Sequence, residues 1–267
     1  MNIIISECKK SHAINFYSFN TYLSLFIWPV IMFFEAYFAY KPFNINENKG
    51  VGQFISASEL PIFLLLGYLS FIFYMSMVQS AFQMSHERTR GTLEVIFLSP
   101  VSRLGMLYGR AFGNLVESTW LFLIFTLLGF IYMDIFAGLN WMSLLLSLAL
   151  LIVSSVVWGG LLNALMLFSR DSGIFFELLL DPLNMFSGVR MPVVLLPLFG
   201  QIISLFFPLT FVLKILRGLI IQNLSIISMV DDFIYLSLVL SVYAFITHLI
   251  VKKAEKNAMN SGSFNLF

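Results

Sequence analysis

The sequence predicts an all-α integral membrane protein with six transmembrane helices. Of the 267 residues, 59% are hydrophobic and only 11% are charged, and the mean hydropathy is +0.91. Soluble domains carry roughly 25% charged residues, because their surface has to be wetted. The apolar runs are about 20 residues long and do not alternate with polar residues, which is the pattern of membrane-spanning helices. Lipid offers no hydrogen-bond partners, so the backbone of these runs has to bond within each helix.

The composition also excludes several classes of function. The net charge is +1 and no basic patch carries interleaved aromatic residues, so we expect no nucleic-acid partner. The single cysteine, Cys8, excludes an internal disulfide, and the three histidines are scattered, so no metal site is expected. No paired His/Asp or Ser/His arrangement lies in the apolar runs. We therefore expect no catalytic residues and no enzyme in this chain by itself.

The whole chain, residues 1–267, forms one predicted transmembrane domain. Residues 1–20 mix apolar and charged side chains and are typical of an amphipathic helix that lies in the membrane interface. The six spans are predicted at residues 21–40, 58–82, 108–133, 141–168, 174–188 and 231–251.

Two interruptions between these spans carry unusual sequence. Residues 83–107 form the longest charged loop, yet this loop also contains several large apolar residues, among them Leu93 and Phe97. Large apolar side chains are unfavourable in a fully solvated linker, so we expect them to contact a membrane or a partner protein. Residues 189–223 are apolar but broken by three prolines. This pattern fits two short re-entrant helices, because irregular backbone at membrane depth has to be sheltered by protein.

The distribution of Lys and Arg predicts the orientation. If the N-terminus is cytoplasmic, ten of the 15 basic residues lie on the inner side and five on the outer side. Cytoplasmic loops carry the excess of Lys and Arg in membrane proteins. Both termini are therefore expected in the cytoplasm, with the hairpin of residues 189–223 at the outer face.

Polar side chains within the predicted spans are candidates for function, because ionisable groups are costly in lipid. Glu177, Asp181 and Asn184 share one face of the fifth span. They could line a translocation path or a dimer seam. The alternative is internal pairing with the stripe of the third span, Arg110, Asn114 and Glu117, or with Asn163 of the fourth. Gly159 and Gly160 in the fourth span are expected to allow close helix packing.

Two groups of residues resemble a known family. The first group is Glu87, then Gly91-Thr92-Leu93-Glu94, then Ser99-Pro100-Val101-Ser102-Arg103 and Gly109-Arg110. The second is Phe186-Ser187-Gly188, Pro192, Leu196-Pro197, Gln201, Pro208-Leu209-Thr210 and Arg217. In this order and at these places in a six-span layout, they resemble the permease subunits of type-two ATP-binding-cassette (ABC) exporters. The resemblance covers essentially the whole chain.

The resemblance implies that the loop within residues 83–107 contains a coupling helix, which docks into a cytoplasmic ATPase and transmits its motion to the spans. The polar contacts to the ATPase would come from Glu87 and Glu94, and the apolar packing from Leu93 and Phe97. The other residues of this implied coupling site are Gly91, Thr92 and Arg103. The implied outer hairpin is marked by Gly188, Pro192, Pro197 and Pro208.

The chain has no phosphate-binding G-x-x-x-x-G-K-[ST] loop. The resemblance therefore implies a separate ATPase chain, which would bind ATP and Mg²⁺, and no cofactor in this chain. A six-span subunit is half of such an exporter, so the expected complex holds two permease chains and two ATPases in a bilayer. A homodimer is the simplest assembly, and a heterodimer with a related permease is the alternative.

The substrate is left open by the sequence. The expected location is a bacterial cell membrane, and the expected substrate is an amphiphilic drug, lipid or peptide. Polysaccharide or teichoic-acid export is the alternative within the same family. A different class is an ion-coupled secondary transporter, in which Glu177 and Asp181 would relay protons or ions. No internal inverted repeat supports that class.

Overall fold

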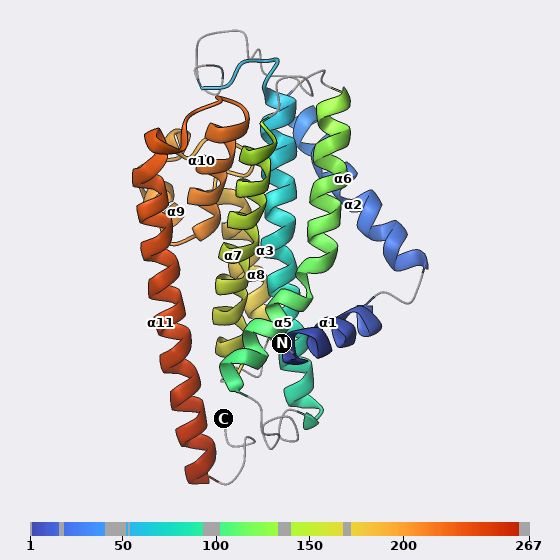
Figure 1. Cartoon of the computed structure of the whole chain (residues 1–267), viewed down its shortest axis with the longest axis vertical. Helices are drawn as coiled ribbons and strands as arrows, with labels where there is room; N and C mark the ends of the chain where they lie inside the picture. Colours follow the sequence, from blue (N-terminus) through green and yellow to red (C-terminus); the bar gives the residue numbers. More distant parts are fainter. Residues whose placement is uncertain are drawn as a thin grey trace.

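The computed structural model describes residues 2–15, 19–40, 52, 54–92, 102–132, 140–167 and 172–261. All regular secondary structure within these ranges is helical. The long helices run side by side in an elongated bundle, while α1 lies crosswise near one end (Figure 1). The first predicted feature, an all-α protein, is thereby confirmed for the described residues.

The helices follow one another with few irregular segments. In chain order they are α1 Asn2–Asn15, α2 Phe19–Tyr40, α3 Leu60–Thr89, α5 Arg103–Gly113, α6 Leu115–Tyr132, α7 Trp141–Leu165, α8 Ser172–Phe186, α9 Leu198–Ser204, α10 Pro208–Ile220 and α11 Val230–Ser261. Two 3₁₀ turns precede α9 and α11, namely η3 Val193–Leu195 and η4 Ile226–Met229.

Four helical stretches within the described residues are long and apolar enough to cross a bilayer. They are Leu60–Thr89, Arg103–Ile131, Trp141–Leu165 and Ile226–Asn257. A bent pair, Leu198–Ser204 with Pro208–Ile220, meets the same test if its two helices, 92° apart, are taken as one span. These features identify a helical membrane protein. The first and fifth of the six predicted spans correspond to α2 and the 15-residue α8, and their crossing of the membrane stays a prediction.

The segment between the two helices is shorter in the structure than the loop predicted at residues 83–107. Helix α3 continues to Thr89 and α5 already begins at Arg103. The polar residues that suggested a loop are accommodated in the helix because Glu87 and Arg88 have partners on other elements. The basic His86 and Arg88 also fall in the last turn of α3, where the helix dipole favours positive charge.

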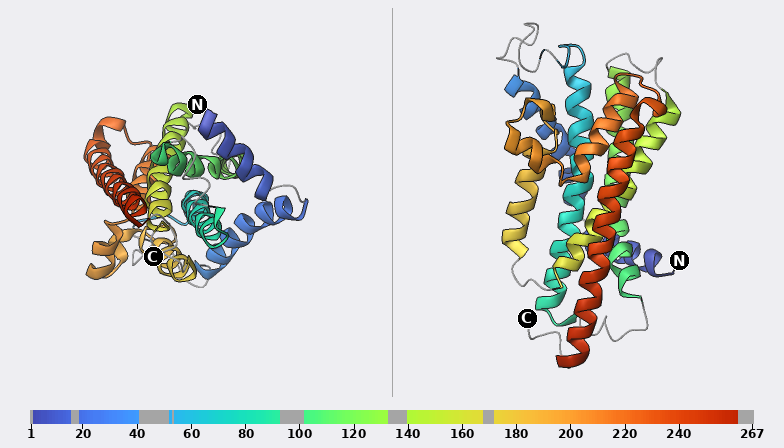
Figure 2. Two further views of the ribbon diagram at one scale, coloured as in Figure 1. Left: turned by 90° about the horizontal axis from the view of Figure 1, so that it is seen from below. Right: turned by 90° about the vertical axis from the view of Figure 1, so that its left-hand side faces the viewer.

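Helix α3 forms the centre of the bundle. It packs against α2, α5, α6, α7, α8 and α10, and in the view from below it lies inside the ring of other helices (Figure 2, left). Its apolar window is 78% buried within the chain, whereas that of α11 is only 17% buried. The outer face of α11 is therefore available to lipid or to another protein.

Close helix contacts depend on two adjacent glycines of α7, as the sequence predicts. A Cβ atom at Gly159 would overlap the sulfur of Met77 on α3, and one at Gly160 would overlap the ring of Tyr108 on α5. Both α3 and α5 approach α7 along this short stretch. The glycines thus set the spacing between the central helices.

We expect Gly160→Val to destabilise the protein by about 1–3 kcal/mol, because the added methyl groups push α5 away from α7. The measurement is thermal unfolding of the detergent-purified chain. Val153→Ile adds bulk to an exposed position of the same helix and is the matched control. An unchanged unfolding temperature for Gly160→Val would contradict the tight contact.

Candidate functional site

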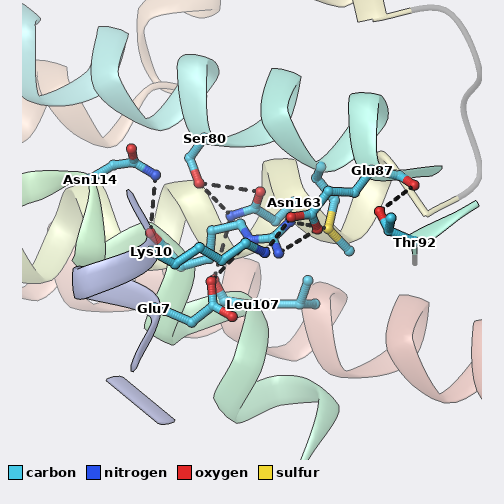
Figure 3. Close-up of polar contacts among 10 residues, drawn as sticks. Glu7, Lys10, Ser80, Glu87, Thr92, Leu107, Asn114 and Asn163 are labelled. Carbon is cyan, nitrogen blue, oxygen red and sulfur yellow. Dashed lines mark hydrogen bonds and ion pairs between the residues drawn. The ribbon is translucent and has the colours of Figure 1, made fainter. Parts of the chain in front are cut away.

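Four charged residues from three helices meet beside the crosswise helix, and Figure 3 labels the three that surround the arginine. We call this group, Glu7 and Lys10 of α1, Glu87 of α3 and Arg110 of α5, the Arg110 cluster. Arg110 Nη2 donates to Glu87 Oε2 at 2.6 Å, and Lys10 Nζ bonds to the other oxygen of the same carboxylate. Arg110 Nε lies 3.6 Å from Glu7 Oε2. The cluster therefore ties α1, α3 and α5 together by charge.

The Arg110 cluster is electrically balanced, and its central guanidinium is buried while Lys10 lies at its more exposed edge. Two acids face two bases, and the Arg110 side chain is only 4% exposed. Its Nη1 faces the sulfur of Met84 at 2.7 Å, so the guanidinium is enclosed on that side as well. Removing one partner of a buried charge pair is costly, because the remaining charge has left water without compensation.

Helix α3 ends just beyond the cluster in a geometry that requires glycine. Gly91 has φ +74°, a left-handed conformation that residues with a Cβ rarely adopt. The hydroxyl of Thr92 donates to the Glu87 carbonyl at 3.0 Å, which covers one of the free carbonyls at the helix end. Both residues belong to the group that resembles the family motif, and their local role is to end α3 directly beside the Arg110 cluster.

A hydrogen-bonded asparagine connects α7 to the same region. Asn163 Nδ2 donates to Ser80 Oγ at 3.2 Å and to the Leu107 carbonyl at 3.4 Å (Figure 3). The side chain of Asn114 donates to the Arg110 carbonyl at 3.2 Å. The asparagines thus link polar groups of α3, α5 and α7 within the bundle, where lipid offers no hydrogen-bond partners.

The structure brings together only some of the residues that the family resemblance implies for ATPase coupling. Glu87 lies in the Arg110 cluster, where both of its carboxylate oxygens have internal partners. Arg103 begins α5 and its Nε lies 3.9 Å from Glu255 Oε1 of α11. Leu93, Glu94 and Phe97 lie outside the described residues, so their contact with an ATPase stays a prediction.

The predicted stripe on α8 is described in part. Asp181 is exposed, Asn184 is half-buried, and the side chain of Glu177 lies outside the described part. Asn184 Oδ1 is buried without a hydrogen-bond partner among the described residues. The partners seen for Arg110 come from α1 and α3, rather than from α8 as the alternative of internal pairing expected. A role of the stripe in a translocation path stays a prediction.

A second buried cation lies at the opposite end of the bundle, on α10. Arg217 Nη1 donates to the Gly188 carbonyl at 2.6 Å, and Nη2 donates to the carbonyls of Val189 and Phe63, each at 3.0 Å. The guanidinium carbon lies 3.3 Å from the centroid of the Phe63 ring. We call these contacts the Arg217 junction. It fastens the end of α8 and the start of α3 onto α10.

Glycines make room for the Arg217 junction. A Cβ at Gly67 would lie 2.6 Å from Arg217 Nη2 and would overlap the Val189 carbonyl. Gly188 has φ +82°, so only glycine places its carbonyl toward the guanidinium at low cost. Gly188 and Arg217 belong to the residues that resemble the family motif, whereas Gly67 lies in an apolar run and carries no motif signal.

Prolines define the helix starts beyond this junction. Pro192 precedes η3, Pro197 precedes α9, and Pro208 is the first residue of α10. Proline is favourable at such positions, because the first turn of a helix has no use for its missing N–H. Between these short helices and α11 the chain encloses a cleft of about 950 Å³.

Lys10 and Glu7 were missed as site residues by sequence reasoning, which assigned them to a surface helix. The only sequence signal is a pair of opposite charges at i and i+3 on one face of α1. That spacing does not indicate which distant residues complete the cluster.

Comparison of the sequence with protein-family models and with curated proteins finds no match. The family resemblance therefore rests on the two groups of motif residues alone.

We expect Glu87→Gln to loosen α1, since Arg110 and Lys10 lose the charge that both of them contact. Cys8 is the single cysteine of the chain and reports on this docking, because its backbone lies 3.2 Å from the position of a Cβ at Gly113 on α5. Burial raises the pKa of the Cys8 thiol, which slows its reaction with maleimide. Labelling should accelerate about tenfold in Glu87→Gln, from the loss of hydrogen bonds to a charged group.

The control for this experiment is Glu255→Gln, which removes a carboxylate from the more distant pair with Arg103. Its Cys8 should react at the original rate. Equal labelling rates in both variants would show that the Arg110 cluster does not hold α1 in place.

Arg217→Lys should destabilise the protein by about 3 kcal/mol, because an ammonium group cannot reproduce the planar fork that reaches three carbonyls. Lys214→Arg, on the exposed face of the same helix, keeps the charge that faces Asp232 and is the control, which should stay within about 0.5 kcal/mol of the original protein. Denaturant or thermal unfolding in detergent measures both. A similar stability of the two variants would contradict the structural role of the Arg217 junction.

Proposed function

We propose that this chain is the transmembrane subunit of an ABC exporter, driven by ATP hydrolysis in a separate nucleotide-binding subunit. The subunit would form the substrate path and convert the motion of the ATPase into movement of its helices. Six spans, with α2 and α8 as the first and fifth, belong to this proposal.

The observation that carries the proposal is the Arg110 cluster at the junction of α1, α3 and α5. Residues 93–101, which contain the segment similar to a coupling helix, join the end of α3 to the start of α5. A force applied to this segment would reach both helices at once. The ion pairs of Arg110 with Glu87 and Glu7 would carry the same force to α1.

The depth of α3 in the bundle supports the mechanical part of the proposal. A helix that packs against six others moves them when it moves, because tightly packed interiors shift as units rather than deform. A displacement that a partner protein causes at one end of α3 would thereby reach the Arg217 junction at the other end. The junction contacts α3 through the Phe63 carbonyl, near the start of that helix.

The motif residues also support the family assignment by their local roles. Gly91 and Gly188 both have left-handed backbone angles, and Arg217 is buried with all its described hydrogen bonds to backbone carbonyls. Such positions tolerate few other residue types. Their order along the chain is that of the family.

The proposed assembly has two permease chains and two ATPases in a bacterial cell membrane, with both termini cytoplasmic. Helix α1 and the end of α11 lie toward the same end of the bundle, in agreement with this orientation (Figure 1). The proposed substrate class is amphiphilic, either a drug, a lipid or a peptide.

Co-purification tests the proposal. The tagged chain is extracted in mild detergent, and a soluble ATPase should be retained in stoichiometric amount. Leu93→Ala and Glu94→Ala should abolish retention, because these residues would form the apolar and polar contacts of the coupling helix. Leu224→Ala, at the other end of the molecule, is the control and should leave retention unchanged.

An intact membrane protein that retains no ATPase would overturn the proposal. That outcome would favour an ion-coupled secondary transporter, and Glu177 and Asp181 would then be the residues to test as relays.

A further inference from the structure

A cleft at the end of the bundle opposite the Arg110 cluster has the chemistry of a lipid site. It lies among α9, α10, η4 and the start of α11, and its volume is about 950 Å³. In Figure 1 these elements lie at the upper left, away from α1 and α5. This end of the bundle lies away from α1 and from the C-terminal end of α11.

One wall of the cleft is apolar and continues onto the outer surface. Leu198, Ile202 and Leu205 of the α9 segment line the cleft, yet each is more than half exposed, Leu198 by 76%. Leu224 and Val194 are also both lining and exposed. Soluble surfaces avoid such continuous apolar patches, whereas alkyl chains bind to them. The wall is therefore open to a hydrocarbon chain that enters from the bilayer.

The polar side of the cleft carries a cation with free donors. Lys214 Nζ lies 2.7 Å from Asp232 Oδ1, but the Lys214 side chain is 66% exposed and that of Asp232 only 13%. An ammonium group has three donors, so one contact with Asp232 leaves donors for another anion. Lysine is a common ligand of phosphate groups.

Two further charges line the cleft. Arg217 forms its floor, and among the described residues no carboxylate lies within ion-pair distance of it. Glu59 also lines the cleft, and its Oε2 accepts hydrogen bonds from the amide and hydroxyl of Ser56. The carboxylates of Glu59 and Asp232 thus have partners within the chain, while the charge of Arg217 is left without an anion.

We propose that this cleft binds one phosphate-bearing membrane lipid, with its acyl chain on the α9 wall and its phosphate on Lys214. Asp232 competes with the phosphate for the ammonium group and so weakens binding. A lipid fits better than a free anion, because the apolar wall would gain nothing from inorganic phosphate. The proposal concerns this chain alone and is independent of an ATPase partner.

The test uses native mass spectrometry of the purified full chain in detergent, with dioleoylphosphatidylglycerol as the probe. We expect one retained lipid per chain. Lys214→Gln should weaken the affinity about tenfold, the loss of one hydrogen bond to a charged group. Asp232→Asn should strengthen it, because the ammonium group is then freed for the phosphate.

The two variants are expected to change lipid affinity in opposite directions, and this distinguishes a lipid site from a structural ion pair. Both substitutions break the same ion pair, so a purely structural role predicts the same effect from each. Equal weakening by both, or no effect of either, would overturn the proposal. Thermal unfolding of each variant confirms that the chain remains folded.

Two further probes separate the possible sources of the signal. Dioleoylglycerol lacks the phosphate and should bind at least about tenfold more weakly than the phospholipid. Inorganic phosphate at millimolar concentration should not displace the lipid, and displacement would instead identify a site for soluble anions. Ile202→Trp should reduce lipid binding by filling the apolar wall, and unchanged binding in this variant would also overturn the proposal.

Discussion

The enclosure of the Arg110 guanidinium is the interaction on which the half of the molecule around α1 and α5 depends. A bilayer provides no water to compensate a buried charge, so this side chain fixes the positions of every element that supplies its partners. Those elements are the crosswise helix α1 and the polar end of α3. Because Glu87 also contacts Lys10, none of the three helices can shift without exposing an unpaired charge. The cluster thus makes a rigid unit from helices that apolar packing alone would leave free to slide.

The Arg217 junction satisfies the same constraint in a different way. Here a single cation is compensated by three carbonyl groups instead of carboxylates, and two glycines supply the space and the backbone angle. Dipoles at short distance stabilise a charge without adding a second one to desolvate. The two ends of α3 are therefore anchored by arginines of α5 and α10, one in an ionic network and one in a backbone cage.

The sequence predicted the long helices well and the contacts between them poorly. Runs such as that of α7 are apolar for longer than any soluble helix requires, so their existence and type follow from hydropathy. Hydropathy predicts the end of this span at residue 82, whereas α3 continues to Thr89, because the partners of Glu87 and Arg88 lie on elements that are distant in sequence. Likewise the sequence does not indicate that the Glu87 carboxylate contacts Arg110 and Lys10, and its contact with an ATPase stays a prediction. No local pattern encodes such pairings, since they depend on tertiary approach.

The sequence separation within the Arg110 cluster has a consequence for how the chain is made. Glu87 follows Lys10 by 77 residues, and Arg110 follows Glu87 by a further 23. During synthesis α1 emerges first and cannot reach its final place until α5 has entered the membrane. The cluster closes only then, so its formation marks the completion of the first half of the protein. Until then the charges of α1 lack the partners that hold them in the folded chain, so the N-terminal helix is placed later than its position in the sequence suggests.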